Sequence, residues 1–439
     1  MMKGMNMNNV QLVKKIAKRM ADVSLVENII RQEEKQGVFV EKGNAHISRS
    51  MLSHGYLGLC LLFNELDLNF PEEGWSVYCN NYLKIVFNEI QNEVISTASL
   101  FSGYAGICLV LDLCSNGGKY LGKARQNIFY YLKMVFNKEL EAILKKEEVD
   151  IFDYDAIEGV AGIVNLLLML NQNEYNSKEE IIRGIQYLVS LAGHKKSSCG
   201  NVPKWHISKE HLFTEGEKKV FPNGILNLGV SHGIAGPLIA LSKAYNKGIQ
   251  VPGQMDAIQL ISNDLIKMKL PGKYGWNGEV GIEEYVNGCN NTKFIRDAWC
   301  YGTPGIAYAL LLSSFTLESE VIREQSYNAM MNRIGKNQEI FSPTFCHGYS
   351  GLAYIYYKFY LLLKEEKFLH ESERLLENII SFYDEGLPFG FPNVERDRGK
   401  KKLFNTVGLL DGVTGTLLTI LELSLKTKKT AWDTAFLLN

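Results

Sequence analysis

The stretch FCHGYSGLAYIYYKFY, from Phe345 to Tyr360, places a cysteine and a histidine directly before a Gly-x-x-Gly motif and a mostly apolar run of helical length. Glycines at i and i+3 lie on one face of a helix, where they let a neighbouring backbone approach closely. The run that follows is hydrophobic nearly all round, which is typical of a helix buried on every side. The stretch therefore predicts an inner helix with two good metal ligands at its N-terminal end.

The same pattern recurs along the whole chain. Each copy has a polar residue, a Gly-x-x-Gly motif and about ten mostly apolar residues. The first glycines of the seven copies are Gly55, Gly103, Gly159, Gly233, Gly302, Gly348 and Gly412. One Gly-x-x-Gly is a weak signal, but seven copies in one chain indicate an internal structural repeat.

Helices with one apolar stripe and one charged face lie between the copies, as in ESERLLENIISFYDE from Glu371 to Glu385. Each repeat therefore predicts an inner and an outer helix that stack on their neighbours, and a linear stack would leave its end units uncovered. We expect an all-α fold in which seven such pairs close into a seven-fold α/α toroid. An open solenoid is the alternative. The ring is favoured because every copy has the fully buried type of inner helix.

The expected organisation is a helical segment over residues 1–50 that packs on the ring, followed by the toroid over residues 51–439. Residues Cys199 to Gly229 are rich in Gly, Asn and Lys and contain short β-like pieces. They predict a small β-containing insertion around residues 195–229. Long loops on one rim are a common place for function.

Composition excludes several functional classes. The 439 residues carry a net charge of −1, so no global field favours nucleic acid. No uncharged apolar run reaches the roughly 18 residues of a spanning helix, and the N-terminus lacks the apolar core of a secretory signal. We expect a cytoplasmic protein whose eight cysteines stay mostly reduced.

Two adjacent repeats carry cysteine in the same register. Cys300 lies two residues before Gly302, and Cys346 lies two residues before Gly348, with His347 beside it. Equivalent positions of a ring collect at one end, so these side chains are expected to be close together. Two thiolates and an imidazole suit zinc, and a fourth position left to water or substrate is typical of a catalytic site. The alternative is that the cysteines are core residues and His347 is a helix cap; the shared register favours zinc.

A zinc ion with this ligand set has two possible uses. Coordination removes the proton from a thiol whose ordinary pKa is about 8.5, so a substrate thiol would become a thiolate near neutral pH. Zinc can also activate water for hydrolysis. Two anionic protein ligands lower the Lewis acidity of the ion and leave a bound thiolate more nucleophilic, which favours thiol alkylation.

Four segments resemble the signature blocks of the lanthionine synthetase C-like family, the lanthipeptide cyclases. They are YDAIEGVAGI from Tyr154, SHGIAG from Ser231, RDAWCYGTPG from Arg296 and FCHGYSG from Phe345. The resemblance spans nearly the whole chain and is closest to cyclases of the nisin and subtilin type. It implies a seven-fold α/α toroid with one zinc ion per chain.

The reaction implied by the resemblance is an intramolecular Michael addition. A cysteine thiolate of a dehydrated lantibiotic precursor peptide attacks a dehydroalanine or dehydrobutyrine, and the products are lanthionine and methyllanthionine thioether rings. Cys300, Cys346 and His347 match the family's zinc ligands. The implied partners are the precursor with its leader peptide, a dehydratase and an ABC exporter. These partners imply peripheral association with a membrane-bound complex.

The resemblance also assigns four catalytic positions. His232 matches a site histidine that would protonate the enolate, as its near-neutral unperturbed pKa allows. Asp155 would orient His232 or take the substrate proton. Arg296 would stabilise the enolate oxygen or hold Asp155. Tyr301, next to a ligand, would donate a hydrogen bond.

Two other functions remain open from the residues. A protein prenyltransferase β-subunit is also an α/α toroid with a thiol-activating zinc. Its ligands include an aspartate and one cysteine, however, whereas this chain offers two register-matched cysteines. A non-catalytic zinc scaffold that binds glutathione or a peptide is the second alternative. The set of Asp155, His232 and Arg296 argues against a loss of catalysis.

Overall fold

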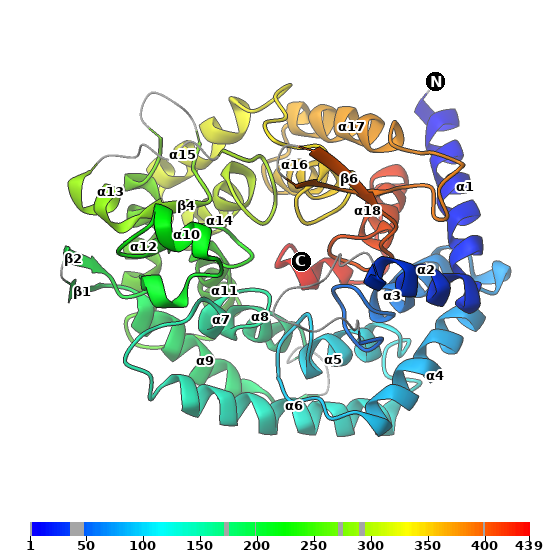
Figure 1. Ribbon diagram of the computed structural model, residues 1–439, viewed down its shortest axis with the longest axis horizontal. Helices are drawn as coiled ribbons and strands as arrows, with labels where there is room; N and C mark the ends of the chain where they lie inside the picture. The colour runs from blue at the N-terminus through cyan, green and yellow to red at the C-terminus, as the bar shows by residue number, and fades with distance from the viewer. Residues whose placement is uncertain are drawn as a thin grey trace. The chain divides into compact units, whose positions relative to one another are not determined.

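The computed structural model describes residues 2–35, 48–170, 175–197, 199–270, 275–288, 295–397 and 400–439. Within these residues the chain is mostly helical, with three two-stranded antiparallel sheets (Figure 1). The expected helical class is therefore confirmed. Residues 36–47 of the predicted N-terminal segment, Ser198 of the predicted insertion and Cys289 lie outside the described residues.

The seven predicted inner helices are all present. Each begins one or two residues after the first glycine of its motif. They are α3 (Leu57–Asn69), α5 (Tyr104–Leu113), α8 (Val160–Leu170), α11 (Ala235–Asn246), α14 (Thr303–Thr316), α16 (Tyr349–Leu363) and α18 (Val413–Leu425). Every residue of α8 is buried, and the other six are buried along most of their length, as an apolar run without a polar face requires.

The other helices are mostly amphipathic or short. They are α1 (Met2–Met20), α2 (Val23–Lys35), α4 (Ser76–Asn92), α6 (Gly122–Ile143), α7 (Ile151–Tyr154), α9 (Lys178–Leu191), α10 (Glu215–Val220), α12 (Gln254–Lys267), α13 (Ile282–Asn287), α15 (Glu320–Met331) and α17 (Glu366–Ile380), with 3₁₀ turns η1 (Pro71–Glu73), η2 (Lys209–His211) and η3 (Trp432–Phe436). Helix α17 shows the expected pattern well, because it buries Phe368, Leu375, Leu376 and Ile379 along one stripe.

The described chain forms two compact units. Unit 1 comprises Met1–Ser96, Phe101–Phe129 and Ile340–Trp432, and unit 2 comprises Thr97–Leu100, Tyr130–Glu339 and Asp433–Asn439. In unit 1, α3 packs against α5 and α18, α16 packs against α18, and α1 packs against α18 and α3. In unit 2, α11 packs against both α8 and α14. Each of α3, α8, α11, α14 and α16 also contacts the helix that follows it, which gives five of the seven predicted pairs of inner and outer helices (Figure 1). Helix α18 is followed only by the 3₁₀ turn η3 and packs against α1.

In several motifs the second glycine lets the loop before the helix fold back onto the helix. A Cβ on Gly305 would overlap with the carbonyl oxygen of Trp299, and a Cβ on Gly162 would overlap with that of Ala156. At these positions the close approach is made by the chain's own preceding loop, six residues upstream, whereas at Gly58 the neighbouring backbone is that of Leu409. These pre-helix loops carry all the candidate site residues.

Backbone hydrogen bonds join successive pre-helix loops in each unit. In unit 2, Ala156 N donates to Ser231 O over 3.0 Å, and Val230 N donates to Cys300 O over 2.9 Å. The corresponding bonds in unit 1 are Leu52 N to Phe101 O, Cys346 N to Leu410 O and Leu410 N to Ser53 O. In each of these bonds the acceptor lies two residues before the first glycine of its motif, so the loops are structurally equivalent.

The strands form three short antiparallel pairs. They are β1 (His194–Ser197) with β2 (Gly200–Pro203), β3 (Ile225–Asn227) with β4 (Glu279–Gly281), and β5 (Asn393–Asp397) with β6 (Lys400–Phe404). The predicted insertion contains β1, β2 and β3 in its described part. The β5–β6 hairpin has no counterpart in the sequence-based expectation.

None of the described helices combines the length and the apolar character that crossing a bilayer requires.

Replacing Gly302 by alanine should destabilise the protein strongly. Gly302 has a φ of +100°, and an added Cβ would overlap with the Arg296 carbonyl oxygen. We expect a loss of about 3 kcal/mol or more. Gly117 is the matched control, because its φ is +65° and an added Cβ would meet nothing within 4 Å. Gly117→Ala should cost only about 1 kcal/mol. Thermal unfolding measures both, and equal losses would contradict the close approach at Gly302.

Candidate metal centre and proton-donor pair

Cys300 lies in the pre-helix loop of α14 and is only 3% exposed. Its carbonyl accepts the Val230 N–H, and the chain then turns at Gly302 to start the helix. Gly302 also forms an isolated bridge with Asp297, which closes the loop on itself. The thiol is therefore held by backbone contacts on both sides of the residue.

Cys346 and His347 lie in the equivalent loop before α16. The Cys346 N–H donates to Leu410 O over 3.0 Å. The His347 ring is 11% exposed and lies between two carboxylates, with Nε2 2.9 Å from Glu395 Oε1 and Nδ1 3.4 Å from Asp411 Oδ1. A carboxylate beside one ring nitrogen orients an imidazole whose other nitrogen binds a metal, and it raises the basicity of that nitrogen.

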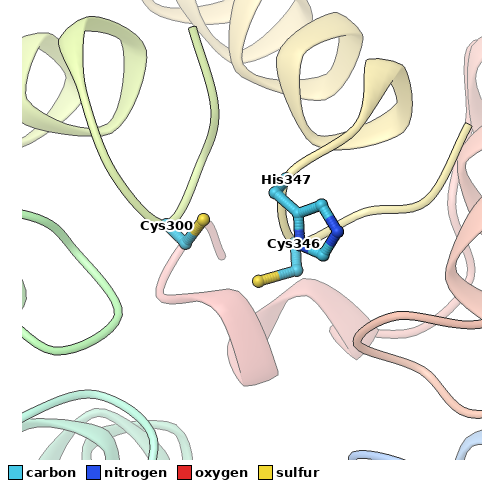
Figure 2. A group of neighbouring side chains, drawn as sticks. All are labelled: Cys300, Cys346 and His347. Carbon is cyan, nitrogen blue, oxygen red and sulfur yellow. The ribbon is translucent and has the colours of Figure 1, made fainter. Parts of the chain in front are cut away.

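The three predicted ligands are grouped. Cys300, Cys346 and His347 each offer one ligand atom, and these atoms lie within 4.8 Å of one another. Figure 2 shows the sulfur atoms of Cys300 and Cys346 pointing toward each other, with the His347 ring beside Cys346. Tetrahedral ligands about 2.0–2.3 Å from a shared zinc ion would lie about 3.3–3.8 Å apart, within the 4.8 Å limit, so the donor set and its spacing are compatible with zinc. This is the one such group of histidine, cysteine or acidic residues found in the part of the chain that the structure describes.

A second candidate site is the pair of His232 and Asp155. His232 lies in the pre-helix loop of α11, and its Nδ1 is 2.5 Å from Asp155 Oδ2. The His232 side chain is 24% exposed, whereas the Asp155 side chain is fully buried. The carboxylate fixes the tautomer: Nδ1 carries a proton toward Asp155, and Nε2 is left for the solvent-facing side.

Asp155 is held rigidly by its own loop. Its Oδ1 accepts the N–H groups of Ile157, Glu158 and Gly159 at 2.7–3.0 Å. These three donors leave Oδ2 for His232. Of the two roles expected for Asp155, the geometry matches the orientation of His232, because the acceptor capacity of the carboxylate is already committed.

The surroundings of His232 shift its pKa. Burial by itself lowers the pKa, but the hydrogen bond and the charge of Asp155 raise it, with smaller contributions from Cys300 and Glu158. The net effect is a raised pKa, so the imidazole holds its proton better than free histidine. The rings of Phe152, Phe213 and Tyr301 lie 5.9, 5.9 and 6.3 Å from the His232 ring and limit its access to water.

Tyr301 and Arg296 flank Cys300 in the same loop, and each is half-buried. Burial raises the pKa of Tyr301 well above its ordinary value, so the hydroxyl keeps its proton. The Arg296 carbonyl is the atom that excludes a side chain at Gly302. Arg296 is expected either to hold Asp155 or to stabilise the enolate oxygen. The polar contacts of Asp155 go to His232 and to amides of its own loop, which leaves the role at the enolate oxygen as the prediction for Arg296.

Sequence reasoning missed several residues of this region. Asn227 is fully buried at the end of β3, and its Nδ2 lies 3.4 Å from the Tyr301 hydroxyl and 3.5 Å from Glu279 Oε1. Burial, with the charge of Glu217, raises the pKa of Glu279 to about 7. Phe213, on the predicted insertion, packs on His232. No local pattern identifies these residues, because strand pairing and loop folding bring them to the site.

Comparisons with known proteins, by family, by sequence and by structure, point to one family. The family described as lanthionine synthetase C-like protein matches residues 46–437. The nisin biosynthesis protein NisC of Lactococcus lactis subsp. lactis is 28% identical over 421 residues, which cover 94% of each chain. A solved structure of a nisin cyclase superposes with a TM-score of 0.78 and 26% identity, covering 94% of this chain and 96% of the other.

The His232–Asp155 pair should make stability depend on pH. A raised pKa means that the folded state binds the proton more tightly than the unfolded state. The pair therefore stabilises the fold below a pH of about 6.5, and this contribution is lost as the pH rises through the folded-state pKa. In Asp155→Asn the His232 pKa should fall, because burial then dominates, and the loss should disappear.

Thermal unfolding between pH 5 and 9, with an NMR titration of the His232 ring, measures both effects; His232→Gln assigns the resonance. Asp256→Asn, an exposed change on α12, is the control and should behave as the unmodified chain. An unchanged His232 pKa in Asp155→Asn would contradict the assigned pair.

Proposed function

The chain belongs to the lanthionine synthetase C-like family, and from that premise we propose that it closes thioether rings in a dehydrated precursor peptide. The observation that carries the proposal is the group of Cys300, Cys346 and His347, placed by equivalent loops of a chain matched over nearly its whole length. The chain is an enzyme of the lanthionine synthetase type. The reaction is the addition of a cysteine thiol to dehydroalanine or dehydrobutyrine.

For the fold we propose a closed seven-fold α/α toroid. Helix α18 of the last repeat packs against α3 of the first, and Leu410 N donates to Ser53 O across the same step. An open solenoid would leave these two repeats apart. Packing of α1 on α3 and α18 supports an N-terminal segment that rests on the ring, and the strands β1 to β3 support an insertion around residues 195–229.

We propose one zinc ion per chain, held by Cys300, Cys346 and His347. A bound zinc ion would supply the charge that keeps the substrate cysteine as a thiolate near neutral pH. One ring nitrogen of His347 would bind the ion, and the carboxylate beside the other nitrogen, Glu395 or Asp411, would accept its N–H and hold the ring in place. The cysteines would be fixed by the hydrogen bonds that join their loops to neighbouring loops.

His232 is the proposed proton donor. When the new carbon–sulfur bond forms at the β-carbon, the electron pair of the double bond moves onto the adjacent carbonyl and gives an enolate. The enolate α-carbon then needs one proton. His232, kept protonated by Asp155, would supply it from Nε2 and would be recharged by the proton that the thiol released.

Tyr301 and Arg296 are the proposed stabilisers of the enolate oxygen. Tyr301 retains its proton and can donate it in a hydrogen bond, and a guanidinium offers a fixed charge. Each lies within four residues of Cys300 in the same loop. Donors aimed at the position where negative charge develops lower the barrier more than they strengthen substrate binding.

The proposed partners follow from the substrate. A dehydrated precursor with its leader requires a dehydratase upstream, and an ABC exporter would remove the product. A cytoplasmic location, with peripheral membrane association through these partners, fits a reaction that needs a free substrate thiol, because reduced thiols persist in that compartment. Of the alternatives, membership of this family removes the prenyltransferase interpretation.

Substitution of either cysteine ligand should remove the metal. Cys300→Ala and Cys346→Ala should each lower bound zinc far below one ion per chain, because two ligands hold zinc weakly. Cys199→Ala is the control, since Cys199 lies outside the group and should leave zinc unchanged. Elemental mass spectrometry of the purified variants measures the metal. One zinc ion in either ligand variant would refute the assignment.

The catalytic proposal is tested with a dehydrated precursor of the nisin type. The unmodified protein should consume its free thiols, counted by mass spectrometry after alkylation. His232→Ala should keep its zinc but slow ring closure about 100-fold or more, because a general acid contributes at least that factor. His370→Ala, at an exposed position on α17, should close rings at the normal rate. Normal closure by His232→Ala would exclude His232 from the mechanism. If the unmodified protein consumed no thiols, the proposed function would fail.

A further inference from the structure

Asn227 is a buried polar residue that connects two parts of the site. Its backbone carbonyl accepts the N–H of Ile234 over 2.9 Å, which closes the turn that carries His232. Its side chain reaches the Tyr301 hydroxyl in the loop of Cys300. One residue thus links the proposed proton donor to the proposed hydrogen-bond donor.

The network fixes which way the Asn227 amide points. Oδ1 accepts the N–H of Gly229 over 3.1 Å, so this end of the amide must be the oxygen. The other end, Nδ2, then carries two N–H donors, and it lies 3.5 Å from Glu279 Oε1 and 3.4 Å from Tyr301 Oη. Each hydrogen of the amide therefore has its own acceptor.

This orientation decides the direction of the Tyr301 hydroxyl. Because Asn227 donates to Tyr301 Oη, the hydroxyl oxygen acts as an acceptor there and its own hydrogen must point elsewhere. No described side chain accepts that hydrogen. A hydroxyl that has one face occupied by a donor and lies beside a proposed metal ligand can direct its own hydrogen at a substrate oxygen.

Glu279 completes the arrangement from the neighbouring strand. The antiparallel pairing of β3 and β4 places it directly opposite Asn227. The charged groups that act on it are Glu217 of α10 and His232. Glu279 is half-buried, and burial together with the charge of Glu217 raises its pKa to about 7.

We propose that Asn227 and Glu279 are positioning residues that direct the Tyr301 hydroxyl at the enolate oxygen of the reacting peptide. The inference rests on the proposed ring-closing function and deepens it. Glu279 accepts one N–H of Asn227 and thereby presents the other N–H to Tyr301. Neither residue touches the substrate, and both act through the direction of one hydroxyl hydrogen.

Asn227→Asp is the sharpest test, because it keeps the shape and the acceptor for Gly229 but replaces the donor with an acceptor. The Tyr301 hydrogen would then turn toward residue 227 and away from the substrate. We expect kcat for ring closure to fall about 100-fold with little change in KM, as in Tyr301→Phe, because each change removes one donor from the enolate oxygen.

The double variant distinguishes positioning from a general structural role. In the Tyr301→Phe background, Asn227→Asp should lower kcat by less than about 3-fold more, because the group through which it acts is already gone. Asn263→Asp, the same chemical change at an exposed site on α12, is the control and should leave kcat unchanged.

Glu279→Leu is an independent test of the positioning role if Asn227→Asp folds poorly. It leaves the β3–β4 backbone pairing intact and removes the acceptor of one Asn227 hydrogen. It should lower kcat about 10-fold, and this loss should also vanish in Tyr301→Phe. Thermal unfolding checks that each variant is folded.

The outcomes separate the inference from the function it rests on. An active unmodified protein with a normal kcat in Asn227→Asp, or with losses that multiply in the double variant, would overturn the positioning role. An unmodified protein that closes no rings would instead overturn the proposed function.

Discussion

Backbone hydrogen bonds between successive pre-helix loops are the constraint on which the rest of this structure depends. Each accepting carbonyl lies two residues before the first glycine of its motif, as at Ser231, Cys300 and Leu410. The side chain at that position is consequently presented in the same way in different repeats. Two repeats use it for cysteine, so a shared position in the repeat becomes proximity of two thiols.

The glycines make these bonds possible. At Gly162, Gly236, Gly305 and Gly415 the second glycine lets the loop lie against the first turn of its own helix, where a side chain would overlap with the carbonyl six residues upstream. A buried helix with a folded loop on its N-terminal end leaves no freedom for the loop to rotate. The pre-helix loops thus hold their side chains with an accuracy close to that of a helix.

The sequence was informative where the chemistry is local. Helical positions, the fully buried inner set and the grouping of Cys300, Cys346 and His347 all follow from spacing within or between equivalent repeats. Contacts between residues that lie far apart in the sequence could not be predicted from the spacing of motifs. Asn227 and Glu279 are 52 residues apart, and only the pairing of β3 with β4 brings them together. His347 and Glu395 meet in the same non-local way, through a hairpin that no periodicity predicts.

The aromatic side chains around His232 have a consequence for the product. The imidazole is held on one side by Asp155 and packs against Phe152 and Phe213, which restricts its orientation. A planar enolate has two faces, and an immobile acid reaches only one of them. With His232 as the proposed acid, the α-carbon of each ring would therefore receive its proton on a single face, and the protein would set the configuration at that carbon.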